Sequence, residues 1–239
     1  MKNKKDILTR AIVLLCVSDR SFLEAETLGS KSYTCEQREE QRNRIYSWLK
    51  KTGYLQYMTQ QEITLFEEAV GGFNSTEIFN CRFQYEAIVV LLWALGLRDM
   101  PNYSCFLEED FHDILKIGTG HNLDILMNTC QLRPEEEIAL QTEVAMLWHW
   151  RAIEMGQVPK DGKSWSDCIK LIFGDEYEAV LRHIPQASQS PHDFLVGETP
   201  VSKLNKTEQG MLDIIAYWRH HAFEWIMSDD AWDEVSADT

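Results

Sequence analysis

The chain has 239 residues, a length that fits one large domain or two small ones. Its composition, with 44% hydrophobic and 26% charged residues, is that of a globular protein and argues against extensive disorder. The net charge of −15 would repel a phosphate backbone, and no basic cluster offsets it except residues 2–5, so nucleic-acid binding is disfavoured. A solubilising surface is the main interpretation of this charge. Docking on a basic partner and mimicry of nucleic acid are the alternatives.

The N-terminal region has only a superficial likeness to a signal peptide. Asp6 and Arg10 interrupt it, and no cleavage site of small residues follows the short apolar run 11–17. The longest apolar run, 87–97, is too short to cross a bilayer. None of the cysteines forms a C-x-x-C pair, and four of them (16, 81, 130 and 168) lie in apolar helical stretches, which indicates reduced thiols. The six are Cys16, Cys35, Cys81, Cys105, Cys130 and Cys168. We therefore expect a cytoplasmic protein without membrane contact.

Helix start and stop signals recur along the whole chain. Four capping boxes pair a Thr or Asn with a Glu or Gln three residues later. They are Thr34 and Gln37, Thr59 and Glu62, Asn74 and Glu77, and Asn205 and Glu208. Pro134, followed by the acidic run 135–137, marks a further first helical position, and glycines mark helix ends at positions 29, 53, 71, 96 and 156.

These signals predict a helical protein. The expected helices cover residues 5–28, 35–52, 60–70, 75–95, 105–117, 121–129, 134–155, 165–173, 175–183 and 206–228. No segment alternates with period two for long enough to require a sheet, so the predicted fold class is all-α.

We expect residues 1–239 to form a single compact multi-helix domain with apolar central helices. Residues 87–95 and 144–153 are apolar around most of the helix circumference, which predicts that both segments are central. Residues 184–204 contain three prolines and several Ser and Gln residues, and are expected to form a long ordered loop. The acidic C-terminal tail, 228–239, contains Trp232, which suggests that the tail folds back onto the body.

Several ordered motifs resemble one family. They are Arg82-Phe-Gln-Tyr-Glu-Ala87 leading into Leu91-Leu-Trp-Ala-Leu-Gly96, the helix start Leu132-Arg-Pro-Glu-Glu-Glu-Ile138, His149-Trp150, Arg219-His220-x-Ala222-x-x-Trp225, and Trp232-Asp-Glu-Val-Ser-Ala-Asp-Thr239. In this order they are similar to the bacterial family catalogued as domain of unknown function 4272, from about the first helix to the last residue. The resemblance implies a bacterial, helical, soluble protein and brings no activity with it. The chain departs from the family pattern at Trp218, where Glu is usual, at Glu224, where Asn is usual, and at Arg151, where Ala is common.

A set of polar and aromatic residues near the central helices forms the candidate site. The set is Arg82, Glu86, His149, Trp150, Arg219, His220 and Trp225. Arg82 and Glu86 are four residues apart and are expected on one helix face. The set is either a pocket that binds a ligand or tunes proton transfer, or a buried network that fixes helix register. We favour the network because no nucleophile accompanies the set.

The last helix narrows the expected contacts of its histidines. One face of this helix is an apolar stripe at helical spacing, and His220 points almost opposite to that face. We therefore expect His220 to contact Glu86 or His149. The stripe consists of Met211, Ile215, Trp218, Ala222, Trp225 and Ile226. Two histidine ligands on one helix need H-x-x-x-H spacing, which the sequence lacks, so no metal is expected. Phosphate-loop, dinucleotide and G-x-S-x-G motifs are also missing from the sequence, so no cofactor is expected.

Two classes of function remain open. The first is a non-catalytic domain of a protein-interaction, regulatory or immunity type that acts through a protein partner. The alternative is a small-molecule-binding or hydrolytic enzyme with a polar pocket at Glu86, His149, Arg219 and His220. The sequence does not decide whether the protein is an enzyme, and it leaves the oligomeric state open.

Overall fold

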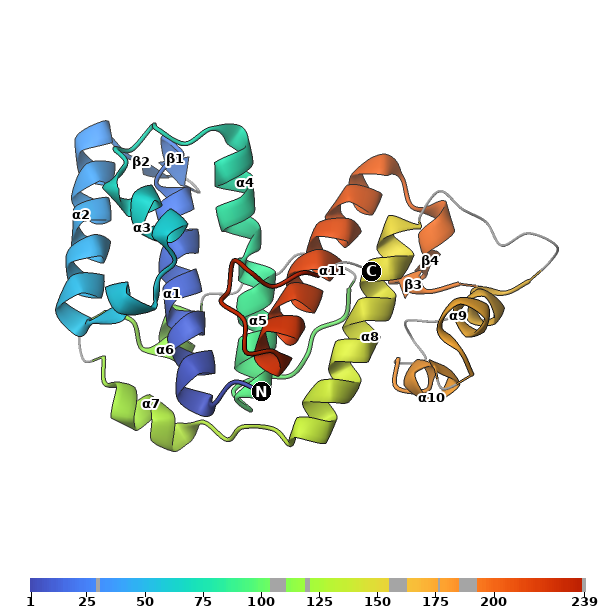
Figure 1. The fold of residues 1–239 in the computed structure, drawn as a ribbon. Helices are drawn as coiled ribbons and strands as arrows, with labels where there is room; N and C mark the ends of the chain where they lie inside the picture. The colour runs from blue at the N-terminus through green and yellow to red at the C-terminus, as the bar shows by residue number, and fades with distance from the viewer. Residues whose placement is uncertain are drawn as a thin grey trace.

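In the computed structural model, α-helices carry most of the chain, and the all-α prediction is confirmed (Figure 1). The structure describes residues 1–28, 31–103, 111–118, 121–154, 163–175, 177–184 and 193–237. The α-helices are α1 (Lys4–Phe22), α2 (Cys35–Thr52), α3 (Gln60–Glu67), α4 (Ser75–Phe83), α5 (Tyr85–Ala94), α6 (His112–Leu115), α7 (Leu123–Thr129), α8 (Glu135–Ile153), α9 (Trp165–Phe173), α10 (Tyr177–Leu181) and α11 (Lys206–Met227). Within the described ranges two 3-10 helices accompany them, η1 (Tyr54–Tyr57) and η4 (Val201–Lys203).

Two antiparallel pairs of two-residue strands complete the described secondary structure. They are β1 (Thr27–Leu28) with β2 (Lys31–Ser32), and β3 (Leu195–Val196) with β4 (Thr199–Pro200). Strands this short have no periodicity to read, which is why the sequence did not predict them. The second pair lies in the predicted loop 184–204, of which residues 185–192 lie outside the described residues.

The helix ends follow the local signals closely. All four predicted capping boxes form, with both reciprocal hydrogen bonds present. Pro134 is the residue before the first turn of α8 and not its first helical residue. Gly53 closes α2 in the left-handed conformation with φ 80°. The predicted glycine stops at 29 and 156, and residues 105–110 of the predicted helix 105–117, lie outside the described residues. The described part of that helix contains the short α6.

The expected helix 75–95 is interrupted. α4 ends at Phe83 and α5 begins at Tyr85, with Gln84 as the residue between them. Arg82 and Glu86 therefore lie on separate helices, and the expected shared helix face is not found. The expected helix 5–28 also ends early, at Phe22, before the strand pair β1–β2.

The buried apolar residues form two clusters. The first is built on α1, α5 and the second half of α11, and the second on α8, α9 and the first half of α11. Residues 87–94 are buried throughout, as predicted for a central helix. α1 is just as deeply buried over residues 7–18, which the sequence did not predict because Arg10 interrupts its apolar run.

The two clusters meet along α11. This helix packs against both α8 and α5, and Figure 1 shows it between the blue and green helices of the N-terminal half and the yellow α8. The assignment of residues 1–239 to one domain remains a prediction, to which the sharing of α11 by both clusters lends support. In the part of the chain that the structure describes, no helix is both long and apolar enough to span a membrane.

Candidate functional site

Arg219 of α11 and Glu86 of α5 form a fully buried ion pair. The guanidinium Nε donates to Glu86 Oε2 at 2.8 Å, and Nη2 lies 2.7 Å from the same oxygen. Nη1 donates to the carbonyl oxygens of Pro101 and Asn102 at 2.9 and 3.0 Å, and the guanidinium lies 4.5 Å from the ring centre of Tyr103. Burial raises the pKa of Tyr103 to about 12, against the opposing charge of Arg219. Such a pair is tolerated in the interior because its charge and donors are matched, and it fastens the segment after α5 to α11.

His149 and His220 form a second contact in the interior. Their Nδ1 atoms are 3.1 Å apart, and His220 Nε2 lies 3.2 Å from Oε1 of the half-buried Glu224. An ionised carboxylate only accepts hydrogen bonds, so Nε2 of a neutral His220 carries the proton and Nδ1 accepts from His149. The prediction that His220 contacts either Glu86 or His149 is therefore met by His149.

The remaining candidates lie apart from these two pairs. Arg82 is exposed on α4, with its guanidinium 4.7 Å from the ring centre of Phe22. Trp150 belongs to the second apolar cluster and Trp225 to the first. The structure thus brings together Glu86 with Arg219 and His149 with His220, but not the seven residues as one set.

The tail, residues 228–237 of the described chain, folds back onto the body through Trp232. Its indole packs edge-on against His221 and Trp225, with ring centres 4.6 and 5.4 Å apart. The Arg10 guanidinium lies 4.7 Å from the same ring, and His221 Nε2 donates to the Trp232 carbonyl oxygen at 3.1 Å. The expected fold-back of the tail is therefore observed, and Trp232 is buried in the first cluster.

Arg10, buried in α1, anchors this region. It forms an ion pair with Glu62 of α3 and donates to the Tyr57 carbonyl oxygen at 3.3 Å. Burial lowers the pKa of Arg10, while Glu62 and Asp233 act in the opposite direction. The guanidinium is thus held between a carboxylate, a backbone carbonyl and the Trp232 ring.

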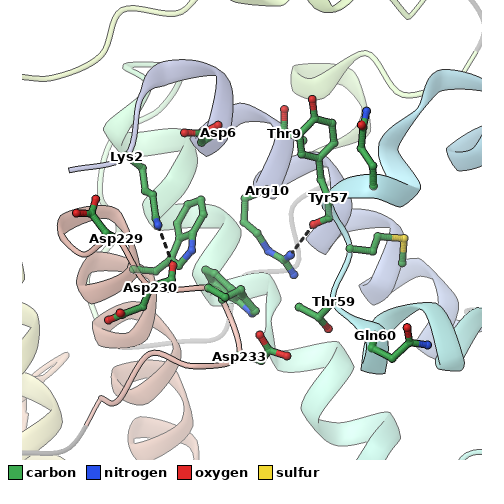
Figure 2. Close-up of a pocket in the computed structure, with 15 residues that line it drawn as sticks. Lys2, Asp6, Thr9, Arg10, Tyr57, Thr59, Gln60, Asp229, Asp230 and Asp233 are labelled. Atoms are coloured by element: carbon green, nitrogen blue, oxygen red, sulfur yellow. Dashed lines mark hydrogen bonds between the residues drawn. The ribbon is translucent and has the colours of Figure 1, made fainter.

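A first hollow, which we call the Lys2 cleft, opens beside this anchor and has a volume of about 520 Å³ (Figure 2). It is lined by Lys2, Asp6, Thr9, Arg10, Gln56, Tyr57, Met58, Thr59, Gln60, Trp225, Asp229, Asp230, Ala231, Trp232 and Asp233. Both cations in the lining are engaged within the chain. Lys2 Nζ donates to the Asp230 carbonyl oxygen at 2.8 Å and lies 5.3 Å from the Trp225 ring centre, whereas Arg10 pairs with Glu62. The lining is therefore acidic on balance.

A second hollow, which we call the His221 cavity, lies among α3, α4, α11 and the tail and has a volume of about 410 Å³. It is lined by Thr59, Gln61, Glu62, Leu65, Glu77, Asn80, Cys81, Gln84, Tyr217, Trp218, His221, Trp232, Asp233 and Val235. Thr59, Trp232 and Asp233 line both hollows, so the tail separates them. Burial lowers the pKa of His221 to about 4, with the charges of Arg10 and His220 acting in the same direction and the Trp232 hydrogen bond opposing them.

Sequence reasoning missed the residues that shape these hollows. Arg10 was read only as an interruption of an apolar run, although a charged residue within such a run indicates a buried ion pair. His221 was read only as a flank of the apolar stripe. Glu62 is predicted only as part of a capping box and Asp233 only as part of a motif, because their interactions with Arg10 join distant parts of the chain.

Five of the six cysteines fall within the described residues. There, Cys16, Cys81 and Cys130 are buried, Cys35 is exposed, Cys168 is partly buried, and all five are free thiols. Cys105 lies outside the described residues. Over the same described ranges, no group of three or more His, Cys, Asp or Glu side chains is arranged to hold a metal ion.

Comparison with known proteins gives a family match. The sequence model of the family described as "Domain of unknown function (DUF4272)" matches residues 1–161. These residues include the motifs at 82–96, 132–138 and 149–150, while those at 219–225 and 232–239 lie beyond them. A search of curated proteins gave no match, and neither did a search of solved structures.

Proposed function

We propose that this chain, which belongs to the family described as Domain of unknown function (DUF4272), is a non-catalytic interaction protein. Its partner would be a protein that presents a basic, Lys- or Arg-rich segment, and the contact would lie at the Lys2 cleft. Under this proposal the protein is a cytoplasmic bacterial protein with a regulatory or immunity role.

The observation that carries the proposal is the charge balance of the Lys2 cleft. Four carboxylates line the cleft, from Asp6, Asp229, Asp230 and Asp233, while its two cations are engaged within the chain. In Figure 2 the tail residues Asp229, Asp230 and Asp233 lie on the side of the hollow opposite Tyr57. Complementary charge steers a basic partner to such a surface, in line with the net charge of −15.

The alternative, an enzyme or small-molecule-binding protein with its pocket at Glu86, His149, Arg219 and His220, receives less support. The donors of Arg219 are directed at Glu86 and at backbone carbonyls in a closed interior. The Lys2 cleft and the His221 cavity have other linings. The variant His149→Ala distinguishes a structural network from a ligand pocket at these residues. Loss of stability alone fits the network, whereas retained stability with lost ligand binding fits the pocket.

A charge-matched affinity experiment tests the interaction proposal. The wild-type chain and the double variant Asp229→Asn/Asp230→Asn serve as baits in a lysate of the native host under several growth conditions. The matched control, Glu135→Gln/Glu136→Gln, removes the same charge from the exposed start of α8. We expect a partner with a basic segment that the wild type and the control retain, and that the tail variant loses. Recovery of the same proteins by all three baits, or of no specific protein, would refute the proposal.

The partner's basic segment is then tested on its own. A synthetic peptide of that segment is titrated into each purified variant by calorimetry. The affinity should fall with rising salt and should drop about tenfold in the tail variant, since each surface charge pair contributes up to about 1 kcal/mol. Equal affinities for the tail variant and the control would place the contact elsewhere.

A further inference from the structure

Four buried arginines of this chain share one kind of surroundings. Each guanidinium contacts a carboxylate, lies over an aromatic ring and donates to a backbone carbonyl. They are Arg10 with Glu62, Trp232 and the Tyr57 carbonyl, Arg20 with Glu24, Phe73 and the Leu65 carbonyl, Arg151 with Asp193, Trp165 and the Glu154 carbonyl, and Arg219 with Glu86, Tyr103 and the Pro101 carbonyl. The fold therefore holds a buried guanidinium repeatedly with the same three groups, which suit its planar charge and its fork of donors.

The His221 cavity is lined by two of these three kinds of group, carboxylates and aromatic rings, and by polar side chains with acceptor atoms. Glu77 and Asp233 supply carboxylates beside Glu62, which pairs with Arg10, and the rings come from Tyr217, Trp218 and Trp232. None of the described residues that line the cavity is a lysine or arginine. Its volume of about 410 Å³ falls in the range of small-ligand sites, about 300–1,000 Å³.

Two acceptors of the lining have no hydrogen-bond partner among the described residues. They are Nδ1 of His221, a residue only 5% exposed, and Oε1 of Gln84. Because a carbonyl oxygen only accepts, the bond to Trp232 places the imidazole proton on Nε2, and the low pKa of His221 leaves Nδ1 a bare acceptor at neutral pH. Both atoms are covered in this structure, and both belong to side chains that line the cavity. Buried acceptors without a donor are costly, so a ligand in the cavity that donates hydrogen bonds would relieve this cost once the side chains turn toward it.

We propose that the His221 cavity is a binding site for a guanidinium cation. The guanidinium would stack on Trp218, donate to the acceptors of the wall and be neutralised by Glu77 and Asp233. An ammonium ion would satisfy the charge but lacks the flat face and the fork of donors that the buried arginines use here. The cation comes either from a small molecule or from an arginine side chain of another protein. The site does not depend on the partner proposed above, since Asp229 and Asp230 do not line this cavity.

Calorimetric titration with matched probes tests the site and its source. L-Argininamide represents a small molecule, and acetyl-Gly-Arg-Gly-amide represents a chain. The citrulline counterpart of each keeps its shape and loses the charge. We expect saturable binding of an arginine probe and at least tenfold weaker binding of its citrulline counterpart. Binding of L-argininamide assigns a small-molecule source, and binding of the tripeptide alone assigns a protein source.

Three variants locate the binding. Trp218→Leu should weaken it about fivefold by removing the ring, and Gln84→Glu should tighten it by adding a carboxylate. Trp48→Leu is the same change at a tryptophan that lines a separate hollow with Ile45 and His121, and it should leave the affinity within about twofold. Circular dichroism and thermal melts verify that each variant folds, and Gln84→Glu decides the question if Trp218→Leu does not fold. No saturable binding of either arginine probe, equal binding of citrulline, or equal effects at Trp48 and Trp218 would overturn the proposal.

Discussion

The buried imidazole of His221 should make the stability of this protein depend on pH. The perturbation that reveals it is His221→Gln, because the amide nitrogen of glutamine can still donate to the Trp232 carbonyl oxygen while the titrating group is removed. In the native protein the ring is buried beside Trp232 and donates through Nε2 at 3.1 Å. The protonated imidazole of His221 is therefore less favourable in the folded chain than in the unfolded chain.

The magnitude follows from the two pKa values. The ordinary pKa of histidine is 6.5, and burial lowers that of His221 to about 4. Below pH 6.5 the unfolded chain takes up a proton that the folded chain refuses until about pH 4, so the unfolding free energy falls as the pH drops through this window. Between about pH 7.5 and about pH 4.5 the loss due to His221 is about 2.5 kcal/mol.

Urea unfolding of wild type and variant across this pH range measures the effect. The charged and titratable groups around the ring are Arg10, Glu62, Glu77, His220 and Asp233. They are common to both proteins, so the difference between the two curves isolates His221. The stability advantage of the wild type over His221→Gln should shrink by about 2.5 kcal/mol toward low pH. His183→Gln, at an exposed histidine, is the matched control. A difference between wild type and His221→Gln that does not change with pH would refute the reasoning.

Three further predictions concern packing and backbone. Glu86→Gln leaves the Arg219 charge buried without a counter-ion, and urea unfolding should show a loss of about 3–5 kcal/mol. Gly96 has φ 67°, and an added Cβ would meet a backbone carbonyl oxygen at 2.8 Å, so Gly96→Ala should lower the melting temperature. The control is Gly210→Ala, at a glycine in α11. A Cβ added there meets no atom within 4 Å, so this variant should be more stable by about 0.5–1 kcal/mol. Trp232→Ala should cost about 3–5 kcal/mol in urea unfolding, because it removes a buried indole from the core.

The fold was predictable wherever local chemistry decides structure. The capping boxes beginning at Thr34, Thr59, Asn74 and Asn205 place helix starts through hydrogen bonds within four residues, and all of them form. The interruption at Gln84 could not be read in this way. Periodicity on both sides of it is helical. Only tertiary packing distinguishes the two helices, since α4 packs mainly against α1 whereas α5 packs against both α1 and α11.

The sequence indicates several of the residues that pair in the interior, but not which residues they pair with. The sequence singled out Glu86, Arg219, His149 and His220 because charged and titratable groups in apolar helices need partners. Which residues pair depends on how distant helices meet, as the pairing of Glu86 with Arg219 of α11 shows. The helix face that Arg82 and Glu86 are expected to share is not found, because the helix is interrupted at Gln84. The hollows beside the tail depend on contacts between the two ends of the chain, which no local pattern encodes.

Arg151 shows how a single departure from a family pattern can report a contact. The resemblance places alanine where this chain has an arginine, directly after His149 and Trp150. In the structure Arg151 Nε donates to Asp193 at 2.8 Å, and its guanidinium lies 3.9 Å from the Trp165 ring centre. Asp193 also accepts from two backbone N–H groups in the segment that leads to α11. An unpaired charge in a core helix would lower the folding stability by several kcal/mol. The arginine is therefore tolerated only together with its distant aspartate. A chain that keeps alanine at this position has no such need for an acid at the position of Asp193, and the segment before α11 would have to be fastened by other contacts.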